Sequence, residues 1–238
     1  MKRPLIVPDH LHRNAPDVHA RGPEHTGSTL MSLVVERLGL VDLAKSDVLD
    51  VGCGVRFTQA IVNCDIPIGS YTGVDVYRPL IEYLQREVDD PRFRFLHWDA
   101  QNDRYNPEGV KLTPESRLPI RGDFDIIWLF SVFTHLYPDD ASALLSILRQ
   151  HVRPNGALFF SAFVDDVVAR FEDRIPEDPL AYPCYSKSYM EQLIVGAGWT
   201  VSYVGPPSHE HFIQHYFVCR PAGASGGEKR NWQTAETW

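Results

Sequence analysis

A short apolar strand that runs straight into a glycine turn constrains this chain more than any other feature. Residues 48–54 read Val-Leu-Asp-Val-Gly-Cys-Gly. Because Gly52 and Gly54 carry no Cβ, a ligand can approach the backbone of such a turn closely. A strand that ends in Gly-x-Gly and opens a helix is typical of α/β folds that bind nucleotides.

Three further apolar strands follow, at the spacing of an alternating α/β fold. The second strand, residues 71–76, carries Asp75 near its end, where a ribose-binding carboxylate is expected. The third, residues 93–99, ends in Asp99, and the fourth, residues 124–130, is nearly all apolar, as a strand covered on both faces should be. Since ligands of open α/β sheets bind beyond the carboxyl ends of the strands, both acids are expected at the ligand site.

The glycine turn departs from two common nucleotide-binding patterns. A dinucleotide fingerprint would place a glycine at position 57, which is Phe57 here, and no Gly-Lys-Ser/Thr sequence of a Walker loop follows. Position 56, a glycine in many adenosyl-binding loops, is Arg56. The remaining interpretation is a ligand that contains adenosine but no pyrophosphate.

These motifs together resemble class I S-adenosylmethionine-dependent methyltransferases. The resemblance rests on residues 48–54, Asp75, Asp99, and residues 124–127, 131–136, 148–156 and 157–162. It is specific over residues 47–163 and looser over residues 186–221. It implies an α/β, Rossmann-like methyltransferase fold, with a mostly parallel seven-stranded sheet, an antiparallel last strand and helices on both faces. It also implies S-adenosyl-L-methionine as the cofactor and S-adenosyl-L-homocysteine as the product.

The resemblance assigns the cofactor-binding residues to the glycine turn and the strand ends. They are Asp50, Gly52, Gly54, Asp75, Asp99, Ala100 and Phe130. Asp75 is expected to bind the ribose and Asp99 the adenine, although an acid at either position can also serve only as a helix cap. Asp50 is expected either to contact the ammonium group of the cofactor or to satisfy backbone donors in the turn.

The chemistry requires an aligned acceptor and, for an alcohol, a base that removes its proton. After the fourth strand, the Asn/Asp-Pro-Pro-Tyr/Phe signature of many amino-group methyltransferases is replaced by Phe130-Ser-Val-Phe, which favours an oxygen acceptor. His135 is the predicted general base, because histidine titrates near neutral pH. Its alternative role is to shape the pocket. Glu210 is the second catalytic candidate, as the base or as the group that orients a histidine.

Three polar loops at the predicted sheet edge indicate a hydroxylated acceptor. They are residues 102–122, 173–186 and 206–211, and the predicted substrate-binding residues within them are Tyr105, Tyr182, His209 and His211. The segments 105–109, 131–136 and 214–218 resemble methyltransferases of glycan assembly. The expected acceptor is therefore a sugar or oligosaccharide, such as a mannoside in polysaccharide biosynthesis. A methyltransferase for a phenol or an amine, and a cofactor-binding subunit without chemistry of its own, stay open as alternatives.

Hydrophobic periodicity predicts the remaining elements. A helix is expected from about Ser28 to Leu40, and another near Ser188, where Ser188-x-x-Glu191 matches a capping box. The resemblance implies a closing antiparallel hairpin of residues 200–204 and 212–219. The predicted domains are an N-terminal arm of residues 1–27, a methyltransferase domain of residues 28–221 and a flexible tail of residues 222–238.

Composition restricts the partners. The chain has 238 residues and a net charge of −8, which disfavours binding to nucleic acid. No apolar run approaches the ~20 residues of a membrane span, and the N-terminus lacks the apolar core of a signal peptide. Four dispersed cysteines are expected to be reduced thiols, which favours a cytoplasmic location. Self-association into a homo-oligomer is left open.

No metal site is predicted, although a divalent ion could assist the chemistry. The pair Asp139-Asp140 follows Pro138 and is interpreted as capping a helix rather than binding a metal. The group of His209, Glu210, His211 and His215 matches no standard metal-ligand spacing.

Overall fold

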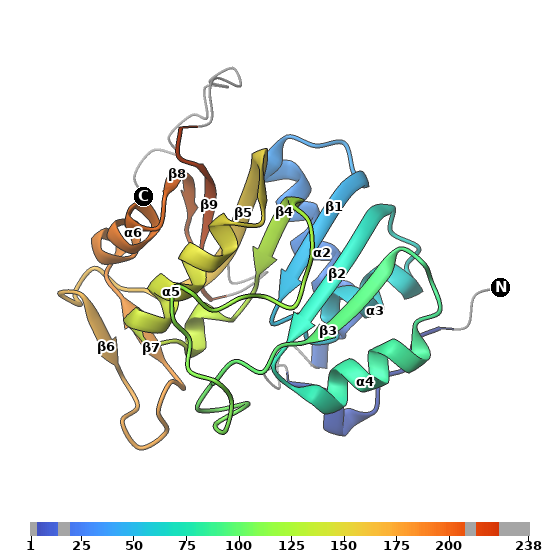
Figure 1. Cartoon of the computed structure of the whole chain (residues 1–238), viewed down its shortest axis with the longest axis horizontal. Coiled ribbons are helices and arrows are strands. Elements are labelled where there is room, and N and C mark those ends of the chain that lie inside the picture. Colours follow the sequence, from blue (N-terminus) through green and yellow to red (C-terminus); the bar gives the residue numbers. More distant parts are fainter. Residues whose placement is uncertain (1–3, 14–19, 208–212, 224–238) are drawn as a thin grey trace.

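A mixed sheet forms the centre of the molecule (Figure 1). The structure is a computed structural model that describes residues 4–13, 20–207 and 213–223. Five strands run parallel, in the order β3-β2-β1-β4-β5. Their bounds are Leu43–Val51 for β1, Ile68–Asp75 for β2, Phe93–His97 for β3, Phe124–Leu129 for β4 and Val152–Val164 for β5.

An antiparallel strand closes the far side of this sheet. β9 (His215–Pro221) lies between β5 and β8 (Trp199–Gly205) and runs antiparallel to both of them. The strands β1–β5, β8 and β9 therefore make the predicted seven-stranded sheet with its antiparallel last strand, and the predicted fold class is confirmed.

A small hairpin extends the sheet beyond β5. β6 (Phe171–Asp173) and β7 (Pro183–Tyr185) pair with each other, and β7 pairs with the last residues of β5. The sequence predicted only a proline-rich loop here, because strands of three residues are too short to show a period of two. The hairpin loop, residues 174–182, lies next to the carboxyl ends of the parallel strands.

Helices cover both faces of the sheet. α2 (Pro23–Leu38), α3 (Arg56–Asn63) and α4 (Arg78–Glu87) cover one face, and α5 (Pro138–Arg149) and α6 (Lys187–Gly196) cover the other (Figure 1). Successive side chains of β1 alternate between the two cores: Val48 packs on the α2–α4 side, and Leu49 and Val51 pack on the α5–α6 side. Two 3₁₀ turns, η1 (Asp9–Leu11) and η2 (Phe133–His135), complete the described elements. No helix in the described part of the chain is long and apolar enough to cross a membrane.

Two helix starts differ from the sequence prediction. α2 begins at Pro23 rather than near Ser28, because proline is well suited to the first helical position, where its missing N–H is not needed. The hydroxyl of Ser186 caps α6 by accepting a hydrogen bond from the Tyr189 amide at 3.2 Å. The predicted capping residue, Ser188, is therefore wrong, and Ser188 lies inside the helix.

The N-terminal segment 4–13 packs against the α2–α4 face. Leu5 and Leu11 are buried in the core on that side. The Leu5 amide donates to the side chain of Asn63 at 2.7 Å, and the Tyr83 hydroxyl donates to the carbonyl of Ile6. These contacts bring Arg13 to the carboxyl edge of the sheet, where the site lies.

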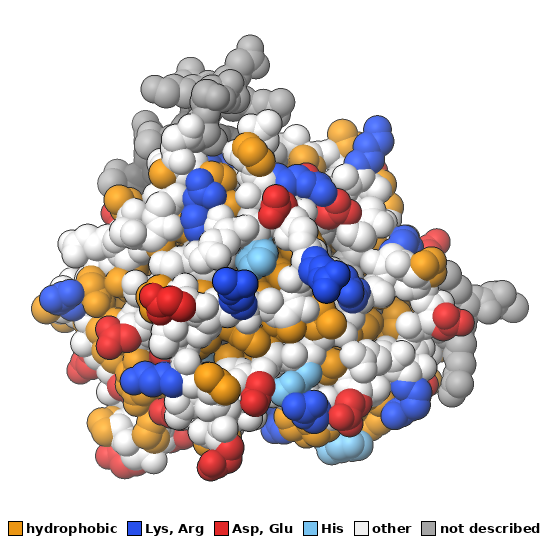
Figure 2. Space-filling view, in the orientation of Figure 1, with side chains coloured by type: hydrophobic (Ala, Val, Ile, Leu, Met, Phe, Trp, Pro, Cys, Tyr) orange, Lys and Arg blue, Asp and Glu red, His pale blue; other side chains and the backbone are white. Residues whose placement is uncertain are grey.

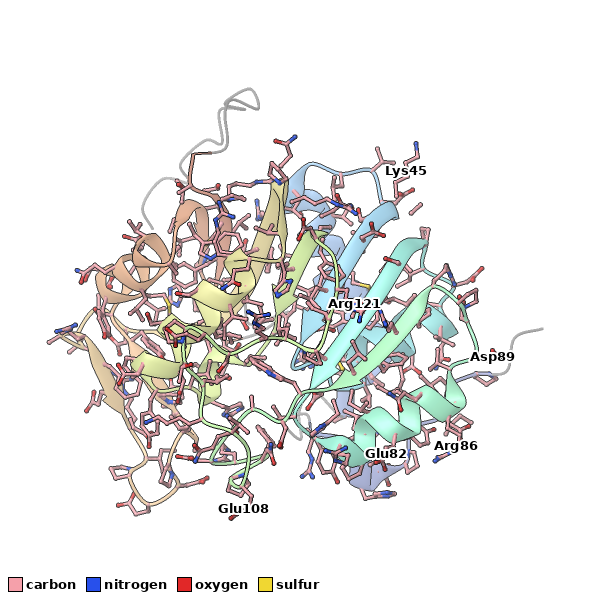
Figure 3. All side chains as sticks on the ribbon, viewed as in Figure 1. Lys45, Glu82, Arg86, Asp89, Glu108 and Arg121 are labelled. Atoms are coloured by element: carbon pink, nitrogen blue, oxygen red, sulfur yellow. The ribbon has the colours of Figure 1, made fainter. Side chains whose placement is uncertain are left out.

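The loop between β3 and β4 also lies at this edge. Residues 98–123 contain turns and two isolated bridges but no helix. Figure 3 labels Glu108 near the tip of this loop, at the lower end of the view and below the ends of the strands.

Candidate functional site

The main cavity opens at the carboxyl ends of β1, β2 and β4 and has a volume of about 220 Å³. Its walls come from the glycine turn, the end of β2, the loop after β3 and the η2 turn. On the face of the molecule shown in Figure 2, hydrophobic side chains cross the middle, and cationic and anionic side chains are interspersed around them. The residues that line the cavity include Arg13, Gly52, Gly54, Asp75, Tyr77, Ala100, Asn102, Tyr105, Phe130 and His135.

The two glycines of the turn have different physical roles. A Cβ on Gly54 would meet no atom within 4 Å, so this backbone borders open space in the cavity. A Cβ on Gly52 would lie 2.5 Å from Cγ2 of Val132, which itself lines the cavity. Both residues have positive φ angles, 72° and 49° for Gly52 and Gly54, which side chains disfavour. Gly54 leaves room for a ligand, and Gly52 leaves room for the cavity wall.

Asp75 lies at the cavity with part of its hydrogen-bonding capacity unused. Its carboxylate accepts from the Gly54 amide at 3.0 Å and from the Tyr77 amide at 2.9 Å. Burial raises its pKa, and the backbone amides and the Arg13 guanidinium oppose that rise. A carboxylate has about four acceptor positions, so Asp75 can accept further donors from a ligand.

Arg13 and Tyr77 form an edge of the cavity that the sequence analysis missed. The Arg13 guanidinium lies 4.0 Å from the centre of the Tyr77 ring, a cation–π distance. Tyr77 follows the predicted ribose acid by two residues, so it was open to prediction. Arg13 was not, because only the docking of the N-terminal segment brings it to the site.

Asp50 lies beneath the glycine turn rather than in the cavity wall. It is 1 % exposed and accepts a hydrogen bond from the Tyr71 hydroxyl. Burial raises its pKa to about 7, opposed by the hydrogen bond from Tyr71 and by the neighbouring Trp128 indole. The Trp128 indole nitrogen does not reach hydrogen-bonding geometry with any described group. Asp50 accepts from a side chain rather than from backbone donors of the turn. It does not line the main cavity, where the predicted contact with the cofactor ammonium group would be made.

The neighbouring predicted cofactor residues Asp99 and Ala100 are divided between the surface and the cavity. Ala100 is buried and lines the cavity. Its backbone amide donates to no acceptor in the described part of the chain. Asp99 is exposed, and its carboxylate accepts from the Asn106 side chain at 3.1 Å. The role of Asp99 in adenine binding stays a prediction.

His135 has one ring nitrogen fixed by the backbone. Its Nδ1 lies 2.9 Å from the carbonyl oxygen of Leu180. Because a carbonyl only accepts, Nδ1 must carry the hydrogen, and in the neutral ring Nε2 is then the unprotonated nitrogen. Burial lowers the pKa of His135, which favours the neutral ring. Tyr105 packs edge-on against this ring, with 5.4 Å between the ring centres.

The β6–β7 hairpin loop holds the carbonyl that binds His135. Leu180 has a φ angle of 60°, a strained conformation for a residue with a side chain. Its amide donates to Asp173 at 2.8 Å, and Arg104 of the β3–β4 loop forms an ion pair with Asp178. These contacts tie two loops to each other and to the imidazole.

Polar contacts also fix the start of the segment that carries His135. The Ser131 amide donates to the Ser161 hydroxyl at 2.9 Å, and the Gln214 side chain donates to the Ser131 hydroxyl at 3.0 Å. Phe130 packs between Phe57 and Phe159, with ring centres 5.1 Å and 5.3 Å away. This packing holds the end of β4 at the cavity.

Among the remaining predicted residues the structure describes only Tyr182, which packs edge-on against Phe163 and does not line the main cavity. His209, Glu210 and His211 lie outside the described residues. Among the residues that are described, no three His, Cys, Asp or Glu side chains are grouped to hold a metal ion.

Comparison with known proteins agrees with the geometry of the site. A family model described as a methyltransferase domain matches residues 49–158, which contain the glycine turn and the strand ends around the cavity. The magnesium protoporphyrin IX methyltransferase of Synechocystis PCC 6803, solved with bound S-adenosylmethionine, has a TM-score of 0.55 at 15 % identity. The match covers 88 % of this chain and 86 % of that one. Residues 49–158 therefore resemble a methyltransferase domain, and the chain shares the fold of a solved methyltransferase.

Other proteins similar to this chain differ in their named substrates. A glycopeptide N-methyltransferase solved with S-adenosylhomocysteine has a TM-score of 0.58 at 12 % identity, covering 82 % of this chain and 90 % of that one. The malonyl-[acyl-carrier protein] O-methyltransferase of Acetivibrio thermocellus is 24 % identical over 66 % of this chain and 49 % of its own length. A phthiotriol/phenolphthiotriol dimycocerosates methyltransferase of Mycobacterium ulcerans is 26 % identical over 59 % of this chain and 46 % of its own. The chain thus spans about half the length of the curated relatives it matches.

Proposed function

We propose that this protein is an S-adenosylmethionine-dependent O-methyltransferase that acts on a hydroxyl group of a small polar acceptor. The observation that carries the proposal is His135, whose Nδ1 is bound by the Leu180 carbonyl while its ring lines the cavity at the glycine turn. A sugar or oligosaccharide is the acceptor class to test first. The protein's work in such a reaction is alignment and removal of the acceptor proton.

The residues present fit the cofactor. Asp75 would accept from the ribose hydroxyls with its unused acceptor positions, and the unpaired amide of Ala100 would donate to the adenine. The bare backbone of Gly54 borders the space that the rest of the molecule would need. When bound, the cofactor supplies the methyl group from its sulfonium.

His135 would accept the proton of the acceptor hydroxyl at Nε2. The Leu180 carbonyl supports this role, because it fixes the tautomer and then stabilises the imidazolium that forms. An alcohol is a weak nucleophile near neutral pH, whereas a carboxylate is already ionised and needs no base. Of these two oxygen acceptors, the hydroxyl is the one that makes use of His135, and the O-methyltransferase name of the malonyl relatives supports oxygen over nitrogen.

The proposal is tested with His135→Ala. We expect the rate of methyl transfer to fall by about two to four orders of magnitude, the usual contribution of a positioned general base. S-adenosylhomocysteine affinity in calorimetry should change little, because the lost interaction is made in the transition state. His151→Ala is the matched control, since His151 lies at the opposite end of the sheet near the start of β5.

The assay is transfer of labelled methyl groups to a panel of neutral sugars, phenols and amines. Below the pKa of His135 the base is protonated, so the rate should rise with pH and then level off; because burial lowers this pKa, the plateau should begin below the range of an exposed histidine. Transfer only to phenols or amines would overturn the acceptor proposal. Tight cofactor binding without transfer to any acceptor would indicate a binding subunit.

A further inference from the structure

A second cavity of about 190 Å³ adjoins the first and has a different chemical lining. The two cavities share Gln101, Asn102 and His135 as walls. The other residues that line the second cavity come from three segments, the β3–β4 loop, the start of α5 and the β6–β7 hairpin loop. Those side chains are Asp103, Lys111, Tyr137, Asp140 and Leu180. Where the main cavity is mostly apolar, this one is bordered mainly by hydrogen-bonding groups.

The charged groups of this second cavity have no hydrogen-bonding partners of their own. Within the described part of the chain, no group donates to the carboxylates of Asp103 or Asp140, and Lys111 forms no ion pair. Charged residues of the neighbouring loops, in contrast, form the ion pairs Arg104–Asp178 and Arg174–Asp165. Polar side chains that border a cavity without protein partners can bind a polar ligand in place of water, without breaking a hydrogen bond within the protein.

The charges of the cavity favour some ligand classes over others. Burial raises the pKa of Asp140, and the carboxylates of Asp103 and Asp139 raise it further while Lys111 lowers it. An anionic ligand would meet at least two carboxylates against one ammonium, which is unfavourable. A hydroxyl group can donate to a carboxylate and accept from an ammonium or an amide, so a neutral ligand with several hydroxyls matches every polar group in the wall.

We propose that this second cavity is the acceptor site, and that its ligand is a neutral, hydroxyl-rich molecule. The inference rests on the proposed function, because it places the reacting hydroxyl at His135, where the two cavities meet. The remaining hydroxyls of the acceptor donate to Asp103 and Asp140 and accept from Lys111. Asp140 and Lys111 are then residues that determine specificity.

Binding rather than turnover tests the site. The probes are methyl α-D-mannopyranoside, methyl α-D-glucopyranoside and myo-inositol, each titrated by saturation-transfer NMR into the protein saturated with S-adenosylhomocysteine. We expect at least one probe to bind. Asp140→Asn and Lys111→Met should each weaken its binding by about tenfold or more, the effect of losing a hydrogen bond to a charged group. S-adenosylhomocysteine affinity should stay the same.

Asp139→Asn is the matched control. Asp139 precedes Asp140 in the first turn of α5, is exposed and does not line the cavity, so it changes the charge at the same helix end without touching the ligand. Equal losses in Asp139→Asn and Asp140→Asn would overturn the site, as would probe binding that neither Asp140→Asn nor Lys111→Met weakens.

Charged analogues and the cofactor itself separate the remaining outcomes. Tighter binding of glucuronate or protonated glucosamine than of the neutral probes would overturn the ligand class. Failure of every neutral probe to bind a protein that binds S-adenosylhomocysteine would overturn this inference and leave the proposed cofactor site intact. Failure to bind S-adenosylhomocysteine would overturn the proposed function itself.

Discussion

Burial shifts the pKa of three ionisable side chains at the carboxyl edge of the sheet. Burial raises the pKa of Asp50 and of Asp75 and lowers that of His135, because it disfavours the charged form of each group. Asp75 has backbone amide donors and stays at the cavity, whereas Asp50 is covered completely. The same residue type, on two neighbouring strands, therefore faces the main cavity in one place and the protein interior in the other.

Removing the Asp75 carboxylate should weaken cofactor binding. We expect Asp75→Ala to reduce the S-adenosylhomocysteine affinity by roughly 1.5–3 kcal/mol, the range for hydrogen bonds to a charged group. Calorimetry measures this directly. Glu82→Ala, on the outer side of α4 (Figure 3), removes an exposed acid and should leave the affinity unchanged. An unchanged affinity in folded Asp75→Ala would show that Asp75 only organises the turn.

Asp50 should make the stability of the unliganded protein depend on pH. Its pKa is about 7 in the folded protein and 3.8 as the ordinary value, so the folded state holds the proton more tightly. Stability from this group is present below about pH 4 and is lost as the pH rises to about 7, at about 1.4 kcal/mol per pH unit. Asp50→Asn cannot ionise and should lack this loss.

Urea unfolding of the wild type and of Asp50→Asn at several pH values between 4 and 8 measures the difference between the two pH profiles. The free energy of unfolding of Asp50→Asn, relative to that of the wild type, should increase as the pH rises. Parallel profiles would mean that Asp50 ionises in the folded protein as easily as in the unfolded chain.

At the scale of elements, short loops and turns position the site, and the helices and strands support them. η2 carries His135, the β6–β7 hairpin supplies the Leu180 carbonyl, and the β3–β4 loop supplies Tyr105 and Asn102. These segments hold one another through the Arg104–Asp178 ion pair and through the Asn102 amide, which donates to the His135 carbonyl at 3.0 Å. Rigid elements beneath them fix where each loop begins and ends.

The start of α6 offers a test of one such boundary. Because the Ser186 hydroxyl accepts from the Tyr189 amide, Ser186→Ala should lower the free energy of unfolding by about 1 kcal/mol, within the usual range for a lost cap. Ser188→Ala removes the exposed hydroxyl two residues further on, 3.4 Å from the Ser186 hydroxyl, and should have little effect because that hydroxyl accepts from no helix amide. Chemical denaturation compares the two variants. Equal effects, or a larger effect at Ser188, would contradict the assignment of Ser186 as the cap.

At the scale of the whole molecule, the topology brings both cavities to one side. The parallel strands end at the same edge, and the chain returns there after β2, β3, β4 and β5 (Figure 1). The net charge is −8, and the face shown in Figure 2 carries both signs interspersed rather than a continuous basic surface for a phosphate backbone. A small ligand enclosed by the domain is the partner that this arrangement suits.

Cofactor binding should stabilise the entire domain. With S-adenosylhomocysteine at one hundred times its dissociation constant, binding should add about 2.7 kcal/mol to the free energy of unfolding. For a domain of this size the melting temperature should rise by roughly 5–10 °C in differential scanning fluorimetry. At the same concentration the shift should be smaller in Asp75→Ala. No shift in the wild type would contradict the cofactor assignment.

The sequence by itself determined the fold class and the approximate position of the cavity that we propose as the cofactor site. Gly54 and Asp75 lie at fixed places relative to apolar strands, and parallel strands must deliver their carboxyl ends to one edge. Local order along the chain was therefore enough to place these two residues together, and the same reasoning placed His135 beside them.

Only the tertiary structure decided the surroundings of those residues. Asp50 and Asp75 each stand near the end of a strand, yet one is covered and the other faces the cavity, a difference that depends on packing from both sides of the sheet. Leu180 and Arg13 reach the site from segments far away in the sequence, and their contacts have no periodicity to reveal them. Pairing between distant loops is fixed by how the elements pack, so it becomes visible only once the chain has folded.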